Sequence, residues 1–307
     1  MHIIRIYALL TGLLLLGACA TRKATVYAPD QLLPSENALL WRISGKGLKQ
    51  ESYLYGTIHV IPKADFRLSE SARAALERSR RVAFEIDMRD MTNLSAQFSL
   101  IGKASMRNGM TLRKLLSDDD YQLVKERIAE KGLPVAGSLE RVKPLFLSMM
   151  LGSDDTEAGA NRQAMTSVEM ELYRLCKKKR IESAGLETID YQMSLFDSIP
   201  YEAQARMLVE MVRKSDASES GELSRMFEMY ARQDINSMQK TISDESDQLI
   251  QYEHLLLTRR NQNWIPVIER MMREKPTFFA VGAGHLAGDQ GVIALLRSRG
   301  YRVEAIP

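Results

Sequence analysis

Hydrophobic positions recur along the chain in two patterns, which predict strands alternating with helices. Short apolar runs of strand length occupy residues 39–43, 53–56, 81–87, 181–186, 277–281 and 301–306. Apolar residues at helical spacing fill 69–79, most of 91–179 and 189–274, and about 290–299, with breaks at 132–134 and 152–160. Strands that alternate with helices in this way predict an α/β fold built on a mixed sheet.

The two ends of the pattern share the same order of elements: a strand, a Gly-x-x-His turn, a helix and a second strand. Residues 53–87 contain the turn from Gly56 to His59, and residues 277–306 contain the turn from Gly282 to His285. We therefore predict pseudo-duplicated βαβ halves separated by a large helical insertion, at about 91–179 and 189–274. Pairing of the two halves across that insertion would bring His59 and His285 together.

The amino terminus has the pattern of a targeting segment. Arg5 precedes an apolar stretch at 6–16, which is too short to span a bilayer as a stable helix. The stretch ends in Leu16-Gly17-Ala18-Cys19, which is similar to the cleavage motif of bacterial lipoproteins. We therefore expect residues 1–18 to be a lipoprotein signal peptide and Cys19 to be the lipidated residue.

This interpretation places a tether at residues 19–37 and the folded domain at 38–307. Ala20 follows the lipidated cysteine, as in lipoproteins sorted to the outer membrane. We expect a protein of the bacterial cell envelope, attached to the membrane by its lipid and facing the periplasm.

Composition excludes one class of partner. The formal net charge is only +3, and no basic stripe is interleaved with aromatic residues, so we expect no nucleic-acid partner. The basic run at 177–180 suits the carboxyl end of a helix. Beyond Cys19 the chain contains only Cys176, so no internal disulfide is expected and Cys176 is predicted to be a buried thiol.

Histidine and glutamate at predicted strand ends indicate a metal site. The chain has four histidines, and two of them, His59 and His285, follow apolar strands in the same way. Glu85 lies within a strand and Glu187 follows one, so all four side chains are expected at the rim where α/β sheets bind ligands. Two imidazoles and two carboxylates suit Zn²⁺, Mn²⁺ or Co²⁺. One of the glutamates could instead act as a general base.

Some of these residues have other interpretations. Asp87 shares a strand face with Glu85 and could replace it as the ligand, and Glu187 could be a first-turn carboxylate of a helix. His254 lies in a helical stretch and is expected to be a surface or core histidine. Residues 282–287 also fit the dinucleotide-binding fingerprint, but too little chain follows them for a nucleotide-binding half, so a metal site is favoured.

Short motifs in a fixed order carry a family resemblance. They are Leu54-Tyr55-Gly56-Thr57-Ile58-His59, Gly185-Leu186-Glu187-Thr188 with Gln192, Arg260-Asn261 with Trp264, and Val281-Gly282-Ala283-Gly284-His285-Leu286 with Gly288 and Gly291. Together they resemble the TraB/PrgY/GumN family over about residues 38–306. The resemblance implies a fold similar to that of the erythromycin esterase and ChaN-like group. One segment departs from it, Ser167-Val168-Glu169, where many relatives have Gly-x-Asp, and this bears on helix packing or substrate contact rather than on the metal residues.

The family includes the animal Tiki proteins, which are membrane-tethered, metal-dependent proteases with two Gly-x-x-His motifs and an essential glutamate. The resemblance therefore implies that His59, His285 and either Glu85 or Glu187 are metal-site residues. Within the same motifs we expect Tyr55, Gln192 and Asn261 to contact the substrate.

The resulting functional hypothesis is a lipid-anchored, metal-dependent hydrolase, specifically a peptidase acting on peptides or envelope proteins. Arg260 is expected either to stabilise the oxyanion or bind a substrate carboxylate, or to form a structural ion pair between helices. The alternative hypothesis is a non-catalytic lipoprotein that binds or sequesters a peptide or an envelope component.

Overall fold

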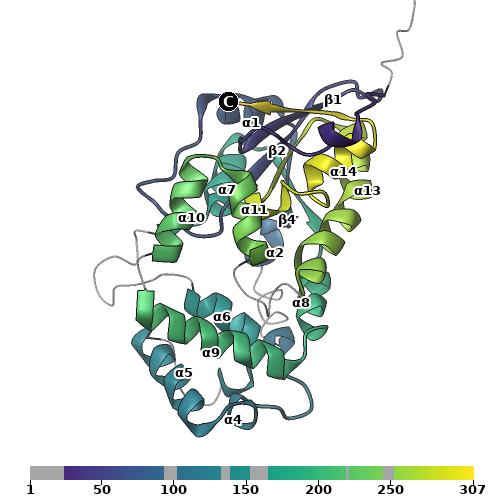
Figure 1. Cartoon of the computed structure of the whole chain (residues 1–307). Helices are drawn as coiled ribbons and strands as arrows, with labels where there is room; N and C mark the ends of the chain where they lie inside the picture. Colours follow the sequence, from purple (N-terminus) through teal and green to yellow (C-terminus); the bar gives the residue numbers. More distant parts are fainter. Residues whose placement is uncertain (1–23, 93–101, 133–138, 153–164, 219–220, 245–251) are drawn as a thin grey trace, which may run out of the picture.

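A six-stranded mixed sheet lies in the upper half of the molecule as drawn in Figure 1, above a group of helices. The computed structural model describes residues 24–92, 102–132, 139–152, 165–218, 221–244 and 252–307. The sheet has the order β6-β4-β7-β2-β1-β8, made of β1 (Leu40–Ser44), β2 (Ser52–Thr57), β4 (Arg81–Ile86), β6 (Glu182–Glu187), β7 (Thr277–Gly282) and β8 (Arg302–Ile306). The α/β class predicted from the sequence is confirmed.

Helices cover the sheet and form a separate lobe. In chain order they are α1 (Glu70–Arg78), α2 (Met88–Thr92), α4 (Leu112–Leu115), α5 (Asp118–Glu130), α6 (Pro144–Gly152), α7 (Val168–Lys179), α8 (Ile189–Asp197), α9 (Tyr201–Ser218), α10 (Gly221–Ala231), α11 (Ile235–Asp244), α13 (Arg259–Glu274) and α14 (Val292–Ser298). Short 3₁₀ turns occur at η1 (Pro29–Gln31), η2 (Leu139–Arg141) and η4 (Ala283–His285). A small second sheet that the hydrophobic pattern did not predict pairs β3 (Ile61–Pro62) with β5 (Met165–Thr166).

The two halves of the expected duplication interleave. Strands β6, β4, β7 and β2 are parallel to one another, and β1 runs antiparallel to both β2 and β8. Strand β7 is inserted between β2 and β4, while β2 and β1 separate β7 from β8. Neither half is therefore the compact βαβ unit that its order of elements suggests, because each half completes its hydrogen bonding with strands of the other.

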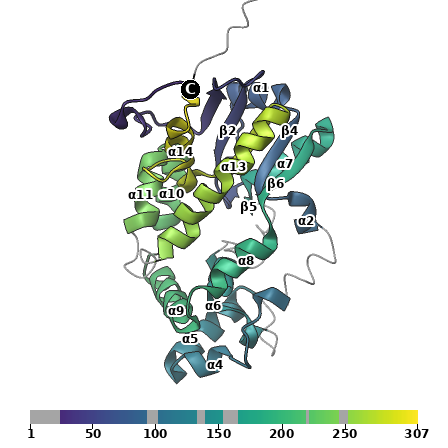
Figure 2. The same cartoon turned by 90° about the vertical axis from the view of Figure 1, so that its right-hand side faces the viewer.

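The two faces of the sheet carry different helices. Successive strand residues point to opposite faces. Phe84 packs edge-on against Tyr173 of α7, whereas Glu85 contacts Arg260 of α13 on the other face. Figure 2 shows α13 crossing one face of the sheet, with α1 on the far side.

Helices α4, α5, α6 and α9 form a lobe with its own hydrophobic core. Val124 and Ile128 of α5 pack there with Leu147 of α6 and Leu208 of α9. In both Figure 1 and Figure 2 the lobe lies beyond the carboxyl ends of β2, β4 and β7. The predicted helical insertion therefore contributes structure on the same side of the sheet as the two Gly-x-x-His turns.

Local signals in the sequence account for several element ends. Ser69 caps α1, with its Oγ accepting a hydrogen bond from the backbone N–H of Ala72 at 3.1 Å. Helix α7 ends with the predicted basic run, and Arg180 adopts the left-handed conformation at φ 57°. Cys176 of α7 is buried, as predicted, and burial raises the pKa of its thiol to about 12.

The amino-terminal segment packs on the domain from residue 25 onward. The Thr25 N–H donates to the Gly300 carbonyl at 3.0 Å, and the Arg297 guanidinium donates to the Gln31 and Leu33 carbonyls. The expected signal peptide and Cys19 lie outside the described residues. No helix within the described part of the chain is long and apolar enough to cross a membrane.

Candidate active site

Parallel pairing of β2 with β7 brings the two Gly-x-x-His turns to the same rim of the sheet. Thr57, the last residue of β2, stands opposite Gly282, the last residue of β7. His59 follows Thr57 by two residues, and His285 follows Gly282 by three. Because the strands run in the same direction, both turns leave the sheet at its carboxyl edge.

His59 is oriented by a carboxylate from α7. Its Nδ1 lies 2.9 Å from Glu169 Oε1, which also accepts a hydrogen bond from the Thr57 hydroxyl at 2.7 Å. The negative charge of Glu169 raises the pKa of His59 to about 9. The imidazole side chain is 69% exposed, and its Nε2 faces Gly282.

His285 is buried and is held in one tautomer. Its Nδ1 lies 2.6 Å from Oδ1 of Asn261, whose amide nitrogen donates to the Gln290 carbonyl at 2.8 Å. Since that amide oxygen can only accept, Nδ1 carries the proton and Nε2 keeps its lone pair. Burial lowers the pKa of His285 to about 3, against the opposing effect of the Glu85 carboxylate, so the ring is neutral.

Glu85 is a buried, ionised carboxylate directed at the same point. Its Oε1 accepts the Gly282 N–H at 2.8 Å and lies 3.8 Å from His285 Nε2, while Oε2 accepts from Arg260 Nη2 at 2.5 Å. Burial alone would raise the pKa of Glu85, but the charge of Arg260 and the nearby histidines hold it well below its usual range.

Arg260 uses all five of its N–H donors within the protein. Nε and Nη2 donate to Glu187 Oε1 at 2.9 and 2.6 Å, and Nη2 also donates to Glu85. Nη1 donates to the Leu256 carbonyl at 3.1 Å and faces the lone pair of His285 Nε2 at 3.2 Å. A guanidinium has five donors, so in this arrangement none remains for a substrate.

Glu187 is fully engaged as well. Besides Arg260, it accepts hydrogen bonds from Trp264 Nε1 at 2.9 Å and from Gln192 Nε2 at 3.3 Å. Burial raises the pKa of Glu187, and the charge of Arg260 opposes that shift. Of the two candidate glutamates, Glu85 therefore faces His285 and lies beside Gly282, as His59 does, whereas Glu187 binds Arg260.

Gly282 marks the point on which the site converges. A Cβ atom at this residue would lie 3.3 Å from Glu85 Oε1, 3.6 Å from His285 Cδ2 and 4.0 Å from His59 Nε2. The missing side chain leaves room among these three groups. The two histidines therefore lie together, as the duplication of the Gly-x-x-His turns predicted.

The donor set fits a divalent transition metal at this point. Both rings have their Nδ1 committed, to Glu169 and to Asn261, which is how metal-binding histidines are commonly oriented. Their Nε2 atoms and Glu85 Oε1 then supply two nitrogens and one oxygen, a set that zinc accepts in catalytic sites. Among the described residues, no three His, Cys, Asp or Glu side chains are already close enough to enclose an ion. To bind one, the exposed His59 ring would have to turn inward, and Arg260 Nη1 would have to release the Nε2 lone pair of His285.

The other residues singled out from the sequence lie elsewhere or act indirectly. Asp87 pairs with Arg89 and accepts from Ser183 at 3.0 Å, so its carboxylate is bound to these residues. His254 is exposed in a short π-helical turn, His254–Thr258, that leads into α13. Asn261 contacts His285, and Gln192 contacts Glu187, so in this structure both brace other site residues.

Glu169 is the site residue that the sequence analysis missed. Glu169 lies in segment 167–169, whose departure from the family pattern was interpreted as unrelated to the metal residues. That interpretation is wrong, because the Glu169 carboxylate contacts His59. Ser167 caps α7 by accepting from Met170 N–H at 3.0 Å, and this cap places Glu169 in the first turn beside β2. The only signal in the sequence was that Glu169 stands where the family resemblance predicts the Asp of Gly-x-Asp, so the position keeps an acidic residue.

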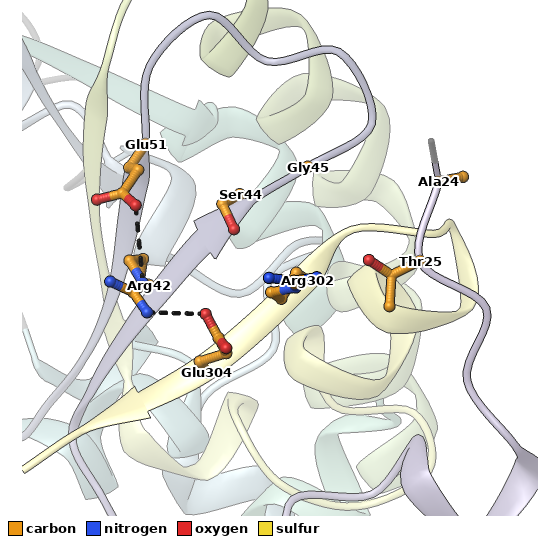
Figure 3. A pocket seen from close by; sticks show the side chains of 8 residues that line it. All are labelled: Ala24, Thr25, Arg42, Ser44, Gly45, Glu51, Arg302 and Glu304. Atoms are coloured by element: carbon orange, nitrogen blue, oxygen red, sulfur yellow. Dashed lines mark hydrogen bonds and ion pairs between the residues drawn. The ribbon is translucent and has the colours of Figure 1, made fainter. Parts of the chain in front are cut away.

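Two cavities in the described structure flank the sheet. One, of about 690 Å³, lies at the edge of the sheet formed by β1 and β8, and Thr25 of the amino-terminal segment also lines it (Figure 3). Three of its charged side chains are paired with one another, Arg42 with Glu304 at 2.9 Å and with Glu51 at 3.8 Å. It lies at the amino end of β2 and β7, away from the histidines. The second cavity, of about 470 Å³, is lined by Tyr55.

Comparison with known proteins identifies the family of the chain. The fold and the site define an α/β protein whose mixed sheet carries two histidines, two glutamates and one arginine at its carboxyl edge. The model of the TraB/PrgY/gumN family matches residues 39–305, and the chain belongs to this family.

The similar curated proteins include several named metalloproteases. Metalloprotease TIKI2 of Danio rerio is 23% identical over 88% of this chain and 61% of its own length, and Metalloprotease TIKI1 of Homo sapiens is 24% identical over 95% of this chain and 67% of its own length. An uncharacterized protein of Treponema pallidum is 20% identical over 92% of this chain and 86% of its own length. The chain thus spans only about three fifths of the zebrafish protein (61%). No solved structure matches the chain.

Proposed function

We propose that this protein is a metal-dependent hydrolase that cleaves amide bonds in peptides or envelope proteins. The observation that carries the proposal is the pair of imidazoles whose Nδ1 atoms are committed to Glu169 and Asn261. His59 Nε2 lies 4.0 Å from the position of a Gly282 Cβ, and His285 Nε2 lies 3.8 Å from Glu85 Oε1. The names of the Tiki metalloproteases support the same reaction class at 23–24% identity.

His59, His285 and Glu85 would hold the ion, as Zn²⁺, Mn²⁺ or Co²⁺. A bound divalent ion supplies a Lewis acid that polarises the carbonyl of the bond to be cleaved. The protein keeps His285 neutral by burial and Glu85 ionised through Arg260, so both are in the protonation state that a metal ligand needs.

Arg260 bridges the two glutamates, because its Nη2 donates to both carboxylates. Its five hydrogen bonds are already made, which supports the structural ion-pair role over the role of an oxyanion donor. Glu187 completes this arrangement by binding Nε and Nη2 together, so that Glu85 Oε1 stays directed at Gly282.

The test uses the full-length protein in detergent, loaded in turn with Zn²⁺, Mn²⁺ and Co²⁺ and presented with a library of internally quenched peptides. We expect about one ion per chain, hydrolysis that a chelator abolishes, and loss of both in His59→Ala and in His285→Ala. Gly102→Ala, where an added Cβ meets nothing within 4 Å, is the control that should keep both. Absence of metal binding and of hydrolysis in the wild type would overturn the proposal.

A non-catalytic binding protein is the second candidate, favoured by one observation. Arg260 already neutralises both carboxylates without a metal, and its Nη1 faces the lone pair of His285. This candidate predicts that peptides bind without being cleaved, whichever ion is supplied. Isothermal titration with peptides released from a cell-envelope digest would distinguish it from the hydrolase.

We further propose that the protein is a lipoprotein anchored through Cys19, at the periplasmic face of the outer membrane. In support, the described chain begins at the end of the molecule away from the helical lobe, so a short lipid tether would leave the histidine rim directed away from the bilayer (Figure 1). Cys19→Ser should abolish labelling by a palmitate analogue and release the protein from the membrane fraction. Unchanged retention would refute the anchor without bearing on the hydrolase.

A further inference from the structure

The cavity of about 470 Å³ has the lining of a pocket for an apolar group. Aromatic and aliphatic side chains make most of its wall: Tyr55, Ile61, Phe66, Phe227, Tyr230 and Leu40. Asp65, Arg67 and Glu228 supply the charged groups. Its volume and its mainly apolar wall are those of sites that enclose one small group or side chain.

The position of the cavity connects it to the histidine rim. Tyr55 lies two residues before Thr57, about 7 Å along β2 from the end of the strand. On the other side of His59, Ile61 of β3 lines the same cavity. The chain segment that carries His59 is therefore bordered by cavity residues both before and after it.

Tyr230 fixes the helix that closes the cavity. Its hydroxyl donates to the Gly56 carbonyl at 3.1 Å, so the carboxyl end of α10 is bonded to the first residue of the Gly-x-x-His turn. Gln233, just after α10, accepts from the Leu39 N–H at 2.9 Å. These bonds connect the end of α10 to β2 and to the residue before β1, so the helix that lines the cavity is bonded directly to the Gly-x-x-His turn.

The position of the cavity beside the segment that carries His59 indicates what the cavity binds. An extended peptide that places its scissile bond at His59 and Glu85 runs on past His59, and its next side chains fall within a few residues' length of the cavity. An apolar wall rejects charged side chains, since burying an unpaired charge is costly. A side chain of the size of leucine or phenylalanine binds favourably there, because the cavity removes its apolar surface from water.

We propose that this cavity is the specificity pocket of the enzyme and binds a large apolar side chain of the peptide substrate close to the cleaved bond. The proposal rests on the hydrolase function proposed above. It assigns Tyr55 to substrate contact as part of a pocket wall formed with Phe227 and Tyr230.

The test narrows the pocket without disturbing the histidines or the core. Ala231 ends α10, is exposed and lines the cavity, so Ala231→Trp adds bulk at the mouth of the pocket. Ala129 is an exposed alanine near the carboxyl end of α5 in the helical lobe, and Ala129→Trp is the matched control. Substrate pairs that differ only in phenylalanine or alanine at each position near the cleaved bond are compared by kcat/KM.

We expect the wild type to prefer phenylalanine at one position by roughly tenfold or more, the scale on which a pocket discriminates a few buried carbons. Ala231→Trp should remove that preference by lowering kcat/KM for the phenylalanine substrate to that for the alanine substrate, whereas Ala129→Trp should keep the preference. Cleavage without any apolar preference, or equal behaviour of the two variants, would overturn the pocket while the hydrolase stands.

A second measurement does not depend on catalysis. The full-length protein labelled with fluorotyrosine is titrated with N-acetyl-phenylalanine amide and with N-acetyl-alanine amide, in the presence of chelator. The ¹⁹F resonance that disappears in Tyr230→Phe should shift with the phenylalanine compound only, and Ala231→Trp should weaken that shift. Binding without peptide cleavage would support the pocket and refute the hydrolase, and absence of any shift would refute the pocket.

Discussion

Thr57 and Gly282 are direct partners in the parallel pairing of β2 and β7. This one register places both Gly-x-x-His turns beyond the same sheet edge and leaves the Gly282 N–H free to donate to Glu85. It also explains why glycine occupies the position, because His59, His285 and Glu85 all border the space that a Cβ would fill. The site is therefore a consequence of strand order and register.

Gly282→Ala should weaken metal binding while leaving the fold intact. The backbone at Gly282 has φ −51°, which alanine adopts without strain, but its methyl group would lie 3.3 Å from Glu85 Oε1. Titration with Co²⁺ followed by absorbance should show at least about a tenfold loss of affinity, the scale for disturbing a ligand's surroundings. Thermal unfolding is the control, and unchanged metal affinity would show that the ion does not bind beside Gly282.

Asn261→Ala should weaken metal binding through His285. The amide oxygen accepts the Nδ1 proton at 2.6 Å, and its loss leaves the ring free to rotate or change tautomer. We expect roughly a 10–100-fold lower affinity for Co²⁺, with partial recovery in Asn261→Asp, which restores an acceptor. Gln262→Ala, at the exposed neighbouring position, is the control and should bind as the wild type does.

Arg260→Ala should destabilise the fold severely. The side chain is 9% exposed and neutralises Glu85 and Glu187, so its removal leaves two buried carboxylates without a cation. Loss of one partner from a buried ion pair costs about 3–5 kcal/mol, which urea unfolding would measure. Arg259→Ala, at the exposed preceding position, should change the free energy of unfolding by less than about 0.5 kcal/mol. A stable Arg260→Ala protein that keeps its metal and loses only turnover would instead support the oxyanion role.

Glu169→Gln should lower the pKa of His59 in the metal-free protein. The Glu169 charge raises that pKa to about 9, and without it the value should fall toward the ordinary histidine value of about 6.5. Because the folded pKa is the higher one, the stabilisation is fully present below about pH 6.5 and is lost as pH rises through about 9. NMR titration of the ring protons measures both effects, with the His254 resonance as the internal comparison; identical His59 curves in the two proteins would refute the pairing.

Cys176 should be inert to thiol reagents in the native protein. Burial raises its pKa to about 12, whereas an unfolded thiol titrates near about 8.5. In the Cys19→Ser protein, Ellman's reagent at pH 8 should therefore react only after unfolding in urea. Since the unfolded state ionises first, stability should also fall as pH rises above about 8.5, and Cys176→Ala should lack that decline. Stoichiometric labelling of the native protein would contradict the burial of this thiol.

The sequence by itself determined the elements and the chemistry at their ends. Strand periodicity located β2 and β7, and Ser69 marked the start of α1, because these signals depend on residues a few positions apart. The repeated Gly-x-x-His turn was equally local, so His59 and His285 could be paired as candidates before any contact was known.

Only the tertiary structure decided which partner each of these residues has. Arg260 lies 175 residues from Glu85 and 73 from Glu187, and its choice between a substrate and these two carboxylates depends on how α13 packs over the sheet. Glu169 contacts His59 because the N-cap of α7 sits beside the end of β2. Hydrogen-bond partners of this kind are set by the packing of distant segments, and no period or motif within one segment encodes them.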